Sequence, residues 1–314
     1  MGIVGGAVVG LLFPGQGSQY VGMGRELAAL RPAARAVFEE ADEILRVRLS
    51  QLCFEGPDTE LTLTHNAQPA ILTHSVAVFS TIAAALGDVG AAAGHSLGEF
   101  SAWVAAGALS FAEAVRLVRH RGELMLKSGE DRPGTMAAIL GLDDETIDRV
   151  CREAGGPDGE CVAANYNSPG QVVISGDTAA VERAIEGARA AGARRALPLN
   201  VSGAFHSPLM RVAEADLAAQ LGAVTFSTPR FPVVSNVTAG PIADAGQARD
   251  LLRRQLTSPV RWAEGIRAMR AVGCSTFIEM GPGNVLTGLL RRIDCEASGR
   301  AIDTAADVDT FLAG

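Results

Sequence analysis

The chain has 314 residues, of which 48% are apolar, and its formal net charge at neutral pH is −8. This length exceeds the usual size of one hydrophobic core, so we expect one large domain and a smaller companion. The negative charge argues against nucleic acid as a partner, and the short, interrupted apolar runs argue against a membrane span.

The first residues are apolar, but they lack the basic start and the cleavage site of a secretory signal. We interpret residues 1–14 as containing a buried first strand. The cysteines form no Cys-x-x-Cys pair, a pattern that predicts neither a disulfide framework nor a zinc site and that fits a reducing cytoplasm. They are Cys53, Cys151, Cys161, Cys274 and Cys295.

Strand-like runs rich in Val, Ile and small residues alternate along the chain with long helical patterns of Ala, Leu, Arg and Glu. This alternation predicts a mostly parallel sheet that is covered by helices. Helices are expected over residues 97–106 and 111–126, and a short one near the C-terminal end. The strand-like runs cover residues 7–13, 89–94, 231–237 and 276–280.

The sequence of strand-like and helical runs changes over residues 132–201, which predicts a compact unit inserted into the large domain. One helix opens at the capping acids Asp143 and Asp144, and a second spans 178–191 and ends at Gly192. Together with four strands the order is β-α-β-β-α-β, that of a ferredoxin-like unit. We therefore predict a small ferredoxin-like domain at 132–201 and a large domain made of 1–131 and 202–314. The four strands are expected at 135–142, 161–166, 171–175 and 195–201.

The sharpest local signal is the G-x-S-x-G pattern Gly94-His95-Ser96-Leu97-Gly98, between a strand of small residues and a helical run. In this context the pattern indicates a nucleophile elbow, which exposes a serine oxygen above the sheet of an α/β-hydrolase-like domain. Side chains at the glycines would collide with the tight turn. A nucleophilic Ser96 is therefore favoured over a structural serine.

A serine hydroxyl is a weak nucleophile and needs a base within hydrogen-bond reach. His206 is favoured because it lies in a loop just after the strand that returns from the small domain. The alternative is a structural histidine at a helix start ahead of Pro208. His95 adjoins the serine, but its side chain is expected to point away from the pocket. Surface or core roles are expected for His65, His74 and His120.

Two further features are open to a functional or a plain structural interpretation. The loop 13–19, which contains Gln16, follows the first strand, where α/β folds present backbone groups to ligands. Neither a dinucleotide fingerprint nor a P-loop fits it, since Tyr20 replaces the required glycine and no Gly-Lys-Ser/Thr is present. Arg121 lies among apolar residues of a predicted helix, where it either snorkels to the surface or offers its donors to a carboxylate.

With these residues assembled, the chain resembles the family of malonyl-CoA:acyl carrier protein transacylases and the acyltransferase domains of polyketide synthases. The resemblance covers most of the length, and nine stretches in the same order carry it. They are FPGQGSQ at 13–19, TxxxQPA at 64–70, GHSLGE at 94–99, FxxAxxLVxxRGxLM at 111–125, NSPGQVVISG at 167–176, AFHSPLM at 204–210, SNVT at 235–238, QLTSPVRW at 255–262 and EMGPGNVLTGL at 279–289.

The resemblance implies a serine acyltransferase with the same inserted ferredoxin-like domain. Ser96 would carry the acyl group and His206 would be its base, with the backbone carbonyl of Gln255 orienting the imidazole in place of a triad acid. The backbone N–H groups of Gln16 and Leu97 would form the oxyanion hole. The activity would be ping-pong transfer of a malonyl group from malonyl-CoA to acyl carrier protein, supplying fatty acid synthesis.

The resemblance also implies how the substrate is chosen. Arg121 would hold the malonyl carboxylate, and the bulky ring of Phe205, where other members carry serine, would disfavour an α-methyl branch. The implied enzyme is a cytoplasmic monomer that needs no metal or redox cofactor and has no nucleic acid or membrane partner.

Other functions compete with this interpretation. A serine hydrolase or thioesterase shares the elbow but should have an acid that completes a triad and an apolar acyl site. A free-standing polyketide synthase acyltransferase has the same chemistry with a different carrier. A non-catalytic binding module has no reason to keep nucleophile, base and arginine together.

An acidic carrier protein needs a local basic surface despite the negative total charge. Three arginine clusters are candidate docking sites, and the sequence does not choose among them. They are Arg116, Arg119 and Arg121; Arg249, Arg253 and Arg254; and Arg291 and Arg292.

Overall fold

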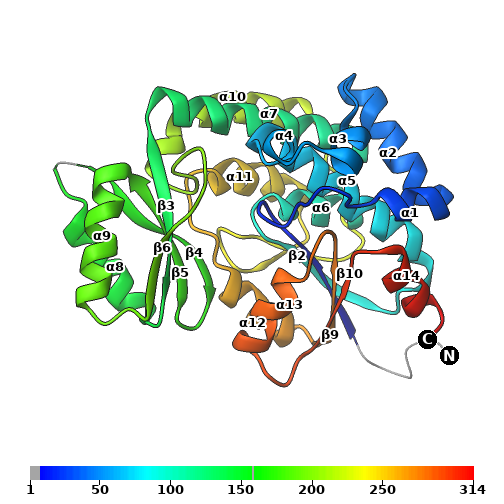
Figure 1. Ribbon diagram of the computed structural model, residues 1–314. Coiled ribbons are helices and arrows are strands. Elements are labelled where there is room, and N and C mark those ends of the chain that lie inside the picture. Colours follow the sequence, from blue (N-terminus) through cyan, green and yellow to red (C-terminus); the bar gives the residue numbers. More distant parts are fainter. Residues whose placement is uncertain (1–7, 158) are drawn as a thin grey trace.

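The computed structural model describes residues 8–157 and 159–314 (Figure 1). A six-stranded sheet in the order β10-β9-β1-β2-β7-β8 forms the centre of the large domain. Its strands are parallel except for β8, which pairs antiparallel with β7. The predicted first strand starts at Ala7, which lies outside the described residues. The strands are β1 Val8–Phe13, β2 Val89–Gly94, β7 Val233–Val234, β8 Pro241–Ile242, β9 Cys274–Met280 and β10 Ser298–Ile302.

Helices cover both faces of this sheet (Figure 1). Along β1, Leu11 and Phe13 belong to the core formed with α5 and α6, whereas Leu12 belongs to the core formed with α12 and α13. Alternate side chains of a strand point to opposite faces, so the sheet is buried on both sides. The helices are α1 Arg25–Leu30, α2 Pro32–Leu45, α3 Leu49–Glu55, α4 Asp58–Leu61, α5 Thr64–Ile82, α6 Gly98–Ala105, α7 Phe111–Asp131, α10 Glu214–Ala223, α11 Ala245–Gln255, α12 Trp262–Ala271, α13 Val285–Ile293 and α14 Ala305–Leu312.

A separate antiparallel sheet in the order β4-β5-β3-β6 carries α8 and α9 and lies beside the large sheet (Figure 1). Asp143 caps α8 by accepting from the backbone N–H of Thr146 at 2.8 Å, as the sequence predicts. Strand β5 lies between β3 and β4, which is the split β-α-β arrangement. The predicted fold class is confirmed, while the exact domain boundaries stay a prediction. The elements are β3 Gly134–Leu140, α8 Asp144–Ala154, β4 Cys161–Ser168, β5 Gln171–Asp177, α9 Thr178–Ala190 and β6 Arg195–Pro198.

Three predicted strands are shorter in the structure. β3 ends at Leu140 instead of residue 142, because Gly141 takes a left-handed φ of 94°. β6 ends at Pro198 instead of continuing to Val201, and the last bond to β3 is made by the backbone N–H of Leu199, which donates to the carbonyl of Met136 at 2.9 Å. β7 keeps only two of the seven predicted residues, because the chain turns directly after it. In that turn the backbone N–H of Ser235 donates to Gly240 at 3.0 Å, which starts β8 and directs Asn236 toward the elbow.

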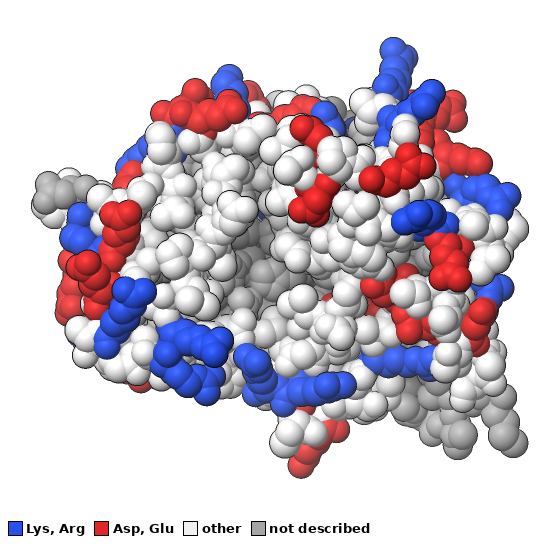
Figure 2. All heavy atoms as spheres, in the orientation of Figure 1, with Lys and Arg blue, Asp and Glu red and all other residues white. Residues whose placement is uncertain are grey.

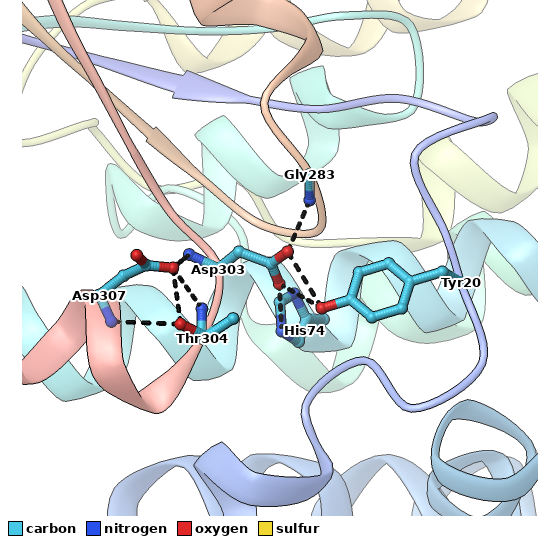
Figure 3. A network of polar contacts seen from close by, with 6 residues as sticks. All are labelled: Tyr20, His74, Gly283, Asp303, Thr304 and Asp307. Atoms are coloured by element: carbon cyan, nitrogen blue, oxygen red, sulfur yellow. Dashed lines mark hydrogen bonds and ion pairs between the residues drawn. The ribbon is translucent and has the colours of Figure 1, made fainter.

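The C-terminal segment, for which the sequence predicts only a short helix, also adds the edge strand β10. Figure 3 shows how Asp303, which follows β10, ties this segment to two loops. Its carboxylate accepts from the hydroxyl of Tyr20 at 3.0 Å and from the backbone N–H of Gly283 at 2.9 Å. Thr304 and Asp307 then form a capping box that starts α14.

Among the described residues, one helix is long and apolar enough to cross a membrane by length and composition alone. It is α5 with the turn that follows, residues 64–85, and 78% of its apolar window is buried inside the protein. That burial is typical of a core helix in a soluble protein.

Candidate active site

The site is assembled at the carboxyl edge of the large sheet. Neighbouring parallel strands are in register there: Phe13 of β1 pairs with Gly94 of β2, and Ala93 of β2 pairs with Val234 of β7. Because parallel strands end at the same edge, the segments that follow β1, β2 and β7 meet in space. They bring the loop 14–19, the elbow and Asn236 together.

The elbow has the strained geometry that its glycines permit. Ser96 has a left-handed φ of 51°, which is uncommon for a residue with a side chain and clusters at functional sites. A Cβ at Gly94 would lie 1.8 Å from the backbone of Gly98, and one at Gly98 would lie 2.1 Å from the carbonyl of Phe13. Only glycine fits at either position, as the sequence predicts.

Asn236, which the sequence leaves without a role, holds the elbow from the next strand. Its Oδ1 accepts from the backbone N–H of Ser96 at 2.7 Å, and its Nδ2 donates to the carbonyl of Gly94 at 2.8 Å. The side chain is 4% exposed, so these bonds replace water for two buried backbone groups. The signal for it was the SNVT stretch, whose place beside the nucleophile only the fold reveals.

The structure brings the predicted nucleophile and base together. Ser96 Oγ lies 2.7 Å from His206 Nε2, and His206 Nδ1 lies 2.9 Å from the backbone carbonyl of Gln255. Since a carbonyl only accepts, Nδ1 carries the proton and Nε2 is free to accept the serine proton. Burial and the nearby Arg121 charge lower the pKa of His206 to about 3, which keeps the imidazole neutral at pH 7.

Arg121 is only 1% exposed and faces the same serine. Its Nη1 donates to Gln68 Oε1 at 2.7 Å, and its Nη2 donates to Gln255 Oε1 and to Ser96 Oγ, both at 3.1 Å. Its buried Nε–H has no hydrogen-bond partner within the described chain. Burial lowers the pKa of the guanidinium to about 10, so it stays charged. The snorkelling alternative is therefore excluded.

A buried carboxyl group, Glu99, lies beneath these residues and was missed by the sequence reasoning. Its Oε2 accepts from Gln255 Nε2 at 2.7 Å and from the backbone N–H of Asn236 at 3.0 Å. Burial raises its pKa to about 7 despite these bonds. The signal for it was its place as the last residue of GHSLGE, although spacing does not show where a side chain points.

The two predicted oxyanion donors, Gln16 and Leu97, both line the cavity that contains Ser96. Their neighbours use their N–H groups internally: that of His95 donates to Phe13 at 3.0 Å and that of Gly98 to His95 at 2.9 Å. Neither of these two internal bonds uses the backbone N–H group of Gln16 or of Leu97, the two groups that are predicted to form the oxyanion hole. The Gln16 side chain is held separately, by a 3.1 Å bond from Nε2 to the hydroxyl of Thr64.

The cavity has a volume of about 400 Å³ and lies between the two sheets. Figure 2 shows it as a hollow whose visible walls carry few charges, with a band of Lys and Arg along its lower rim. Phe205, Met125 and Met136 line it together with Arg121. A buried cation in a mainly apolar cavity favours a ligand that is small, partly apolar and anionic at one end.

The other histidines do not contact the serine. His95 also lines the cavity, but its Nε2 lies 2.8 Å from Asn167 Oδ1 of the small domain and its ring packs against Trp262. His65 and His120 are half-buried and His74 is fully buried. In the part of the chain that the structure describes, no group of three or more His, Cys, Asp or Glu residues could hold a metal ion, and all five cysteines are free.

Comparisons with known proteins show the family of the chain. The acyl transferase domain family matches residues 11–301. A malonyl CoA-acyl carrier protein transacylase of Bacillus subtilis is 49% identical over 91% of this chain and 90% of its own length. The protein of the same name from Salmonella typhimurium is 46% identical over 96% of this chain and 97% of its own.

Solved structures are similar as well. An acyl carrier protein S-malonyltransferase from Vibrio cholerae superposes with a TM-score of 0.92 at 43% identity, covering 96% of this chain and 99% of that one. A malonyl-transacylase in complex with a type II polyketide synthase acyl-carrier protein gives 0.94 at 43% identity, with 98% and 99% covered. The chain therefore belongs to the acyl transferase family, in the group of the malonyl CoA-acyl carrier protein transacylases.

Proposed function

We propose that this chain transfers the malonyl group of malonyl-CoA to the phosphopantetheine thiol of acyl carrier protein, for fatty acid synthesis. The observation that carries the proposal is the contact of Ser96 Oγ with both His206 Nε2, at 2.7 Å, and Arg121 Nη2, at 3.1 Å. A nucleophile, its base and a buried cation in one cavity suit an acyl group that ends in a carboxylate.

In the first half-reaction the Ser96 hydroxyl attacks the thioester carbonyl of malonyl-CoA. Its proton passes to His206 Nε2, and the N–H groups of Gln16 and Leu97 stabilise the tetrahedral oxyanion, each contributing about 3 kcal/mol. The carbon–sulfur bond then breaks, and the departing thiolate of coenzyme A takes the proton from His206. The malonyl group remains as an ester on Ser96.

In the second half-reaction the carrier thiol enters the same cavity. Its proton passes to His206 while its sulfur attacks the ester carbonyl, and the same N–H pair stabilises the second tetrahedral oxyanion. When the ester bond breaks, Ser96 Oγ recovers the proton. Each proton passes between Ser96, His206 and the two substrate thiols, so the proposal includes no metal or redox cofactor.

The partner of His206 argues against the hydrolase alternative. A triad enzyme uses a carboxylate on Nδ1, whereas here Nδ1 contacts the carbonyl of Gln255. Glu99, the carboxyl group in this network, contacts the side chain of Gln255 instead of the imidazole. Arg121 also gives the acyl site a charge that a lipase or thioesterase for apolar acyl groups would not need.

We assign the choice among acyl groups to two side chains, Arg121 and Phe205. The unpartnered Nε–H of Arg121 is a donor for the malonyl carboxylate, which makes the charged end the recognised feature. Phe205 is 5% exposed and lines the cavity, so its ring restricts the space for an α-methyl branch. We therefore propose a preference for malonyl over both acetyl and methylmalonyl.

Of the three arginine clusters, the pair Arg291 and Arg292 is our choice for carrier docking. Both side chains are exposed on α13, whose Leu286 and Leu289 line the cavity. Arg292 also contacts Gln171, another cavity residue, at 2.7 Å. An acidic carrier protein bound here would direct its phosphopantetheine group into the cavity.

The other two clusters are less suited. Arg121 is buried and does not reach the surface. In the other cluster Arg253 contacts Glu214 and Arg254 contacts Asp250, so much of the charge of this pair is already balanced. Reversing the charge of Arg291 and Arg292 together should raise the KM for carrier protein and leave acylation by malonyl-CoA unchanged. An unchanged KM would remove this surface from docking.

A direct experiment separates transfer from hydrolysis. Purified protein is mixed with radiolabelled malonyl-CoA, first alone and then with holo acyl carrier protein. The proposal predicts stable label on the protein in the first case and label on the carrier in the second. Rapid release of free malonate in both cases would favour the hydrolase.

A polyketide carrier is the second candidate partner, because one similar structure is a malonyl-transacylase bound to a type II polyketide synthase acyl-carrier protein. The chemistry is identical for both carriers. Comparing kcat/KM for a fatty acid carrier and a polyketide carrier distinguishes them. We further propose that the enzyme acts as a cytoplasmic monomer, consistent with its free cysteines.

A further inference from the structure

Glu99 is a fully buried carboxyl group to which the proposed reaction assigns no step. It lies in the first turn of α6, three residues after the nucleophile. Burying a carboxyl group is costly unless it is hydrogen-bonded, so its partners indicate what it is for. Those partners are the backbone N–H of Asn236 and, at 2.7 Å, the side-chain NH2 of Gln255.

The side-chain amide of Gln255 has different neighbours at its two ends. The NH2 end faces only acceptors: Glu99 Oε2 at 2.7 Å, the carbonyl of Ser96 at 3.1 Å and Asn236 Oδ1 at 3.4 Å. The oxygen end faces a donor, Nη2 of Arg121, at 3.1 Å. A flipped amide would press its oxygen against three oxygens and its NH2 against the guanidinium, so these contacts decide its orientation.

This orientation matters for Arg121. Two neutral amide oxygens, one from Gln68 and one from Gln255, hold its guanidinium without cancelling its charge. A carboxylate in direct contact would also hold it, but would compete with the carboxylate of a substrate. Glu99 lies one residue behind, where its Oε2 accepts from the amide of Gln255 at 2.7 Å and makes no direct hydrogen bond to Arg121.

We propose that Glu99 is a positioning residue for malonyl selection: it fixes the amide of Gln255, whose oxygen holds Arg121 where the guanidinium meets the substrate carboxylate. This inference rests on the proposed function, because it needs Arg121 as the carboxylate-binding group. It makes Glu99 part of the choice between malonyl and acetyl, although it touches neither.

The test measures the ratio of kcat/KM for malonyl-CoA to that for acetyl-CoA in Glu99 variants. Glu99→Met has similar length and no carboxyl oxygen, and it should lower the ratio about tenfold, mainly through the KM for malonyl-CoA, as loss of one hydrogen bond does. Glu99→Gln keeps an oxygen without the charge and should give a smaller drop. If the Met variant does not fold, the Gln variant decides.

The same substitutions are then made in Arg121→Ala protein, where we expect no further change in the ratio. Glu279→Gln is the matched control, because Glu279 is also fully buried and accepts from two backbone N–H groups, at Leu286 and Thr287. It should lower the unfolding temperature and leave the ratio alone.

Two results would overturn the inference: an unchanged ratio in both Glu99 variants, or a drop of the same size without Arg121. If Arg121→Ala alone leaves the ratio unchanged, the proposed role of Arg121 fails as well. If Arg121→Ala changes the ratio while the Glu99 variants do not, only the role of Glu99 fails.

Discussion

Asn236 offers a quantitative test of how the nucleophile is held. Replacing it with leucine keeps the volume of the side chain and removes both hydrogen bonds to the elbow, at 2.7 Å and 2.8 Å. The backbone N–H of Ser96 and the carbonyl of Gly94 then lose these partners in a buried site. Each loss costs about 1–3 kcal/mol, so we expect Asn236→Leu to lower the free energy of unfolding by about 3 kcal/mol.

The substitution should also slow acylation. Ser96 has a positive φ that the surrounding contacts must enforce, and without Asn236 the turn is free to relax. The assay pairs urea unfolding with single-turnover release of coenzyme A from malonyl-CoA. Both the midpoint and the acylation rate should fall.

Asn66→Leu is the matched control, because Asn66 also makes two hydrogen bonds but is half-buried and lies away from the elbow. Its loss should cost less than about 1 kcal/mol. If the free energy of unfolding of Asn236→Leu lies within about 0.5 kcal/mol of that of the parent protein, and its acylation rate is the same, the elbow does not depend on the hydrogen bonds of Asn236.

Three further predictions follow from burial and charge. Because burial and Arg121 lower the pKa of His206 to about 3, the acylation rate at saturating malonyl-CoA should stay constant as pH falls below 6.5, and Arg121→Ala should move the acid limb to higher pH; an unmoved limb contradicts this coupling. Burial lowers the pKa of His74 to about 4, so between pH 6.5 and 4 the folded state binds fewer protons than the unfolded chain. The free energy of unfolding should therefore decrease as the pH falls from 6.5 to 4. Thermal unfolding of His74→Gln should depend less on pH there, and an equal dependence would assign the effect to other groups. Phe205→Ser should raise the rate with methylmalonyl-CoA relative to malonyl-CoA about tenfold, within the range that one methyl group contributes, and comparable use of both thioesters by the parent protein would defeat the role of Phe205.

Much of the fold followed from local patterns in the sequence. The glycines around Ser96 and the capping acid at Asp143 act over a few residues, so their geometry could be predicted and the structure has it. The order of helices and strands along the small domain also followed, since each element carries its own boundary signal. The shortened β7 could not be predicted, because it ends where the chain turns to reach the elbow.

The candidate site was only partly predictable. Ser96 and His206 were chosen from their motifs, and they lie in contact although 110 residues separate them. The residues that support them are fixed by tertiary contacts that carry no local signal. Asn236 reaches the elbow across 140 residues, and the bond between Glu99 and Asn236 spans 137. Each lay inside a matching stretch, but a motif does not say which atom a side chain contacts.

The central claim is that the elbow serine carries the malonyl group between two thiols. The most direct measurement is mass spectrometry of peptides after brief exposure of the protein to malonyl-CoA. We expect one malonyl group, located on Ser96, which is absent from Ser96→Ala protein and disappears when holo acyl carrier protein is added. A malonyl group on another residue, or none on the active protein, would contradict the account.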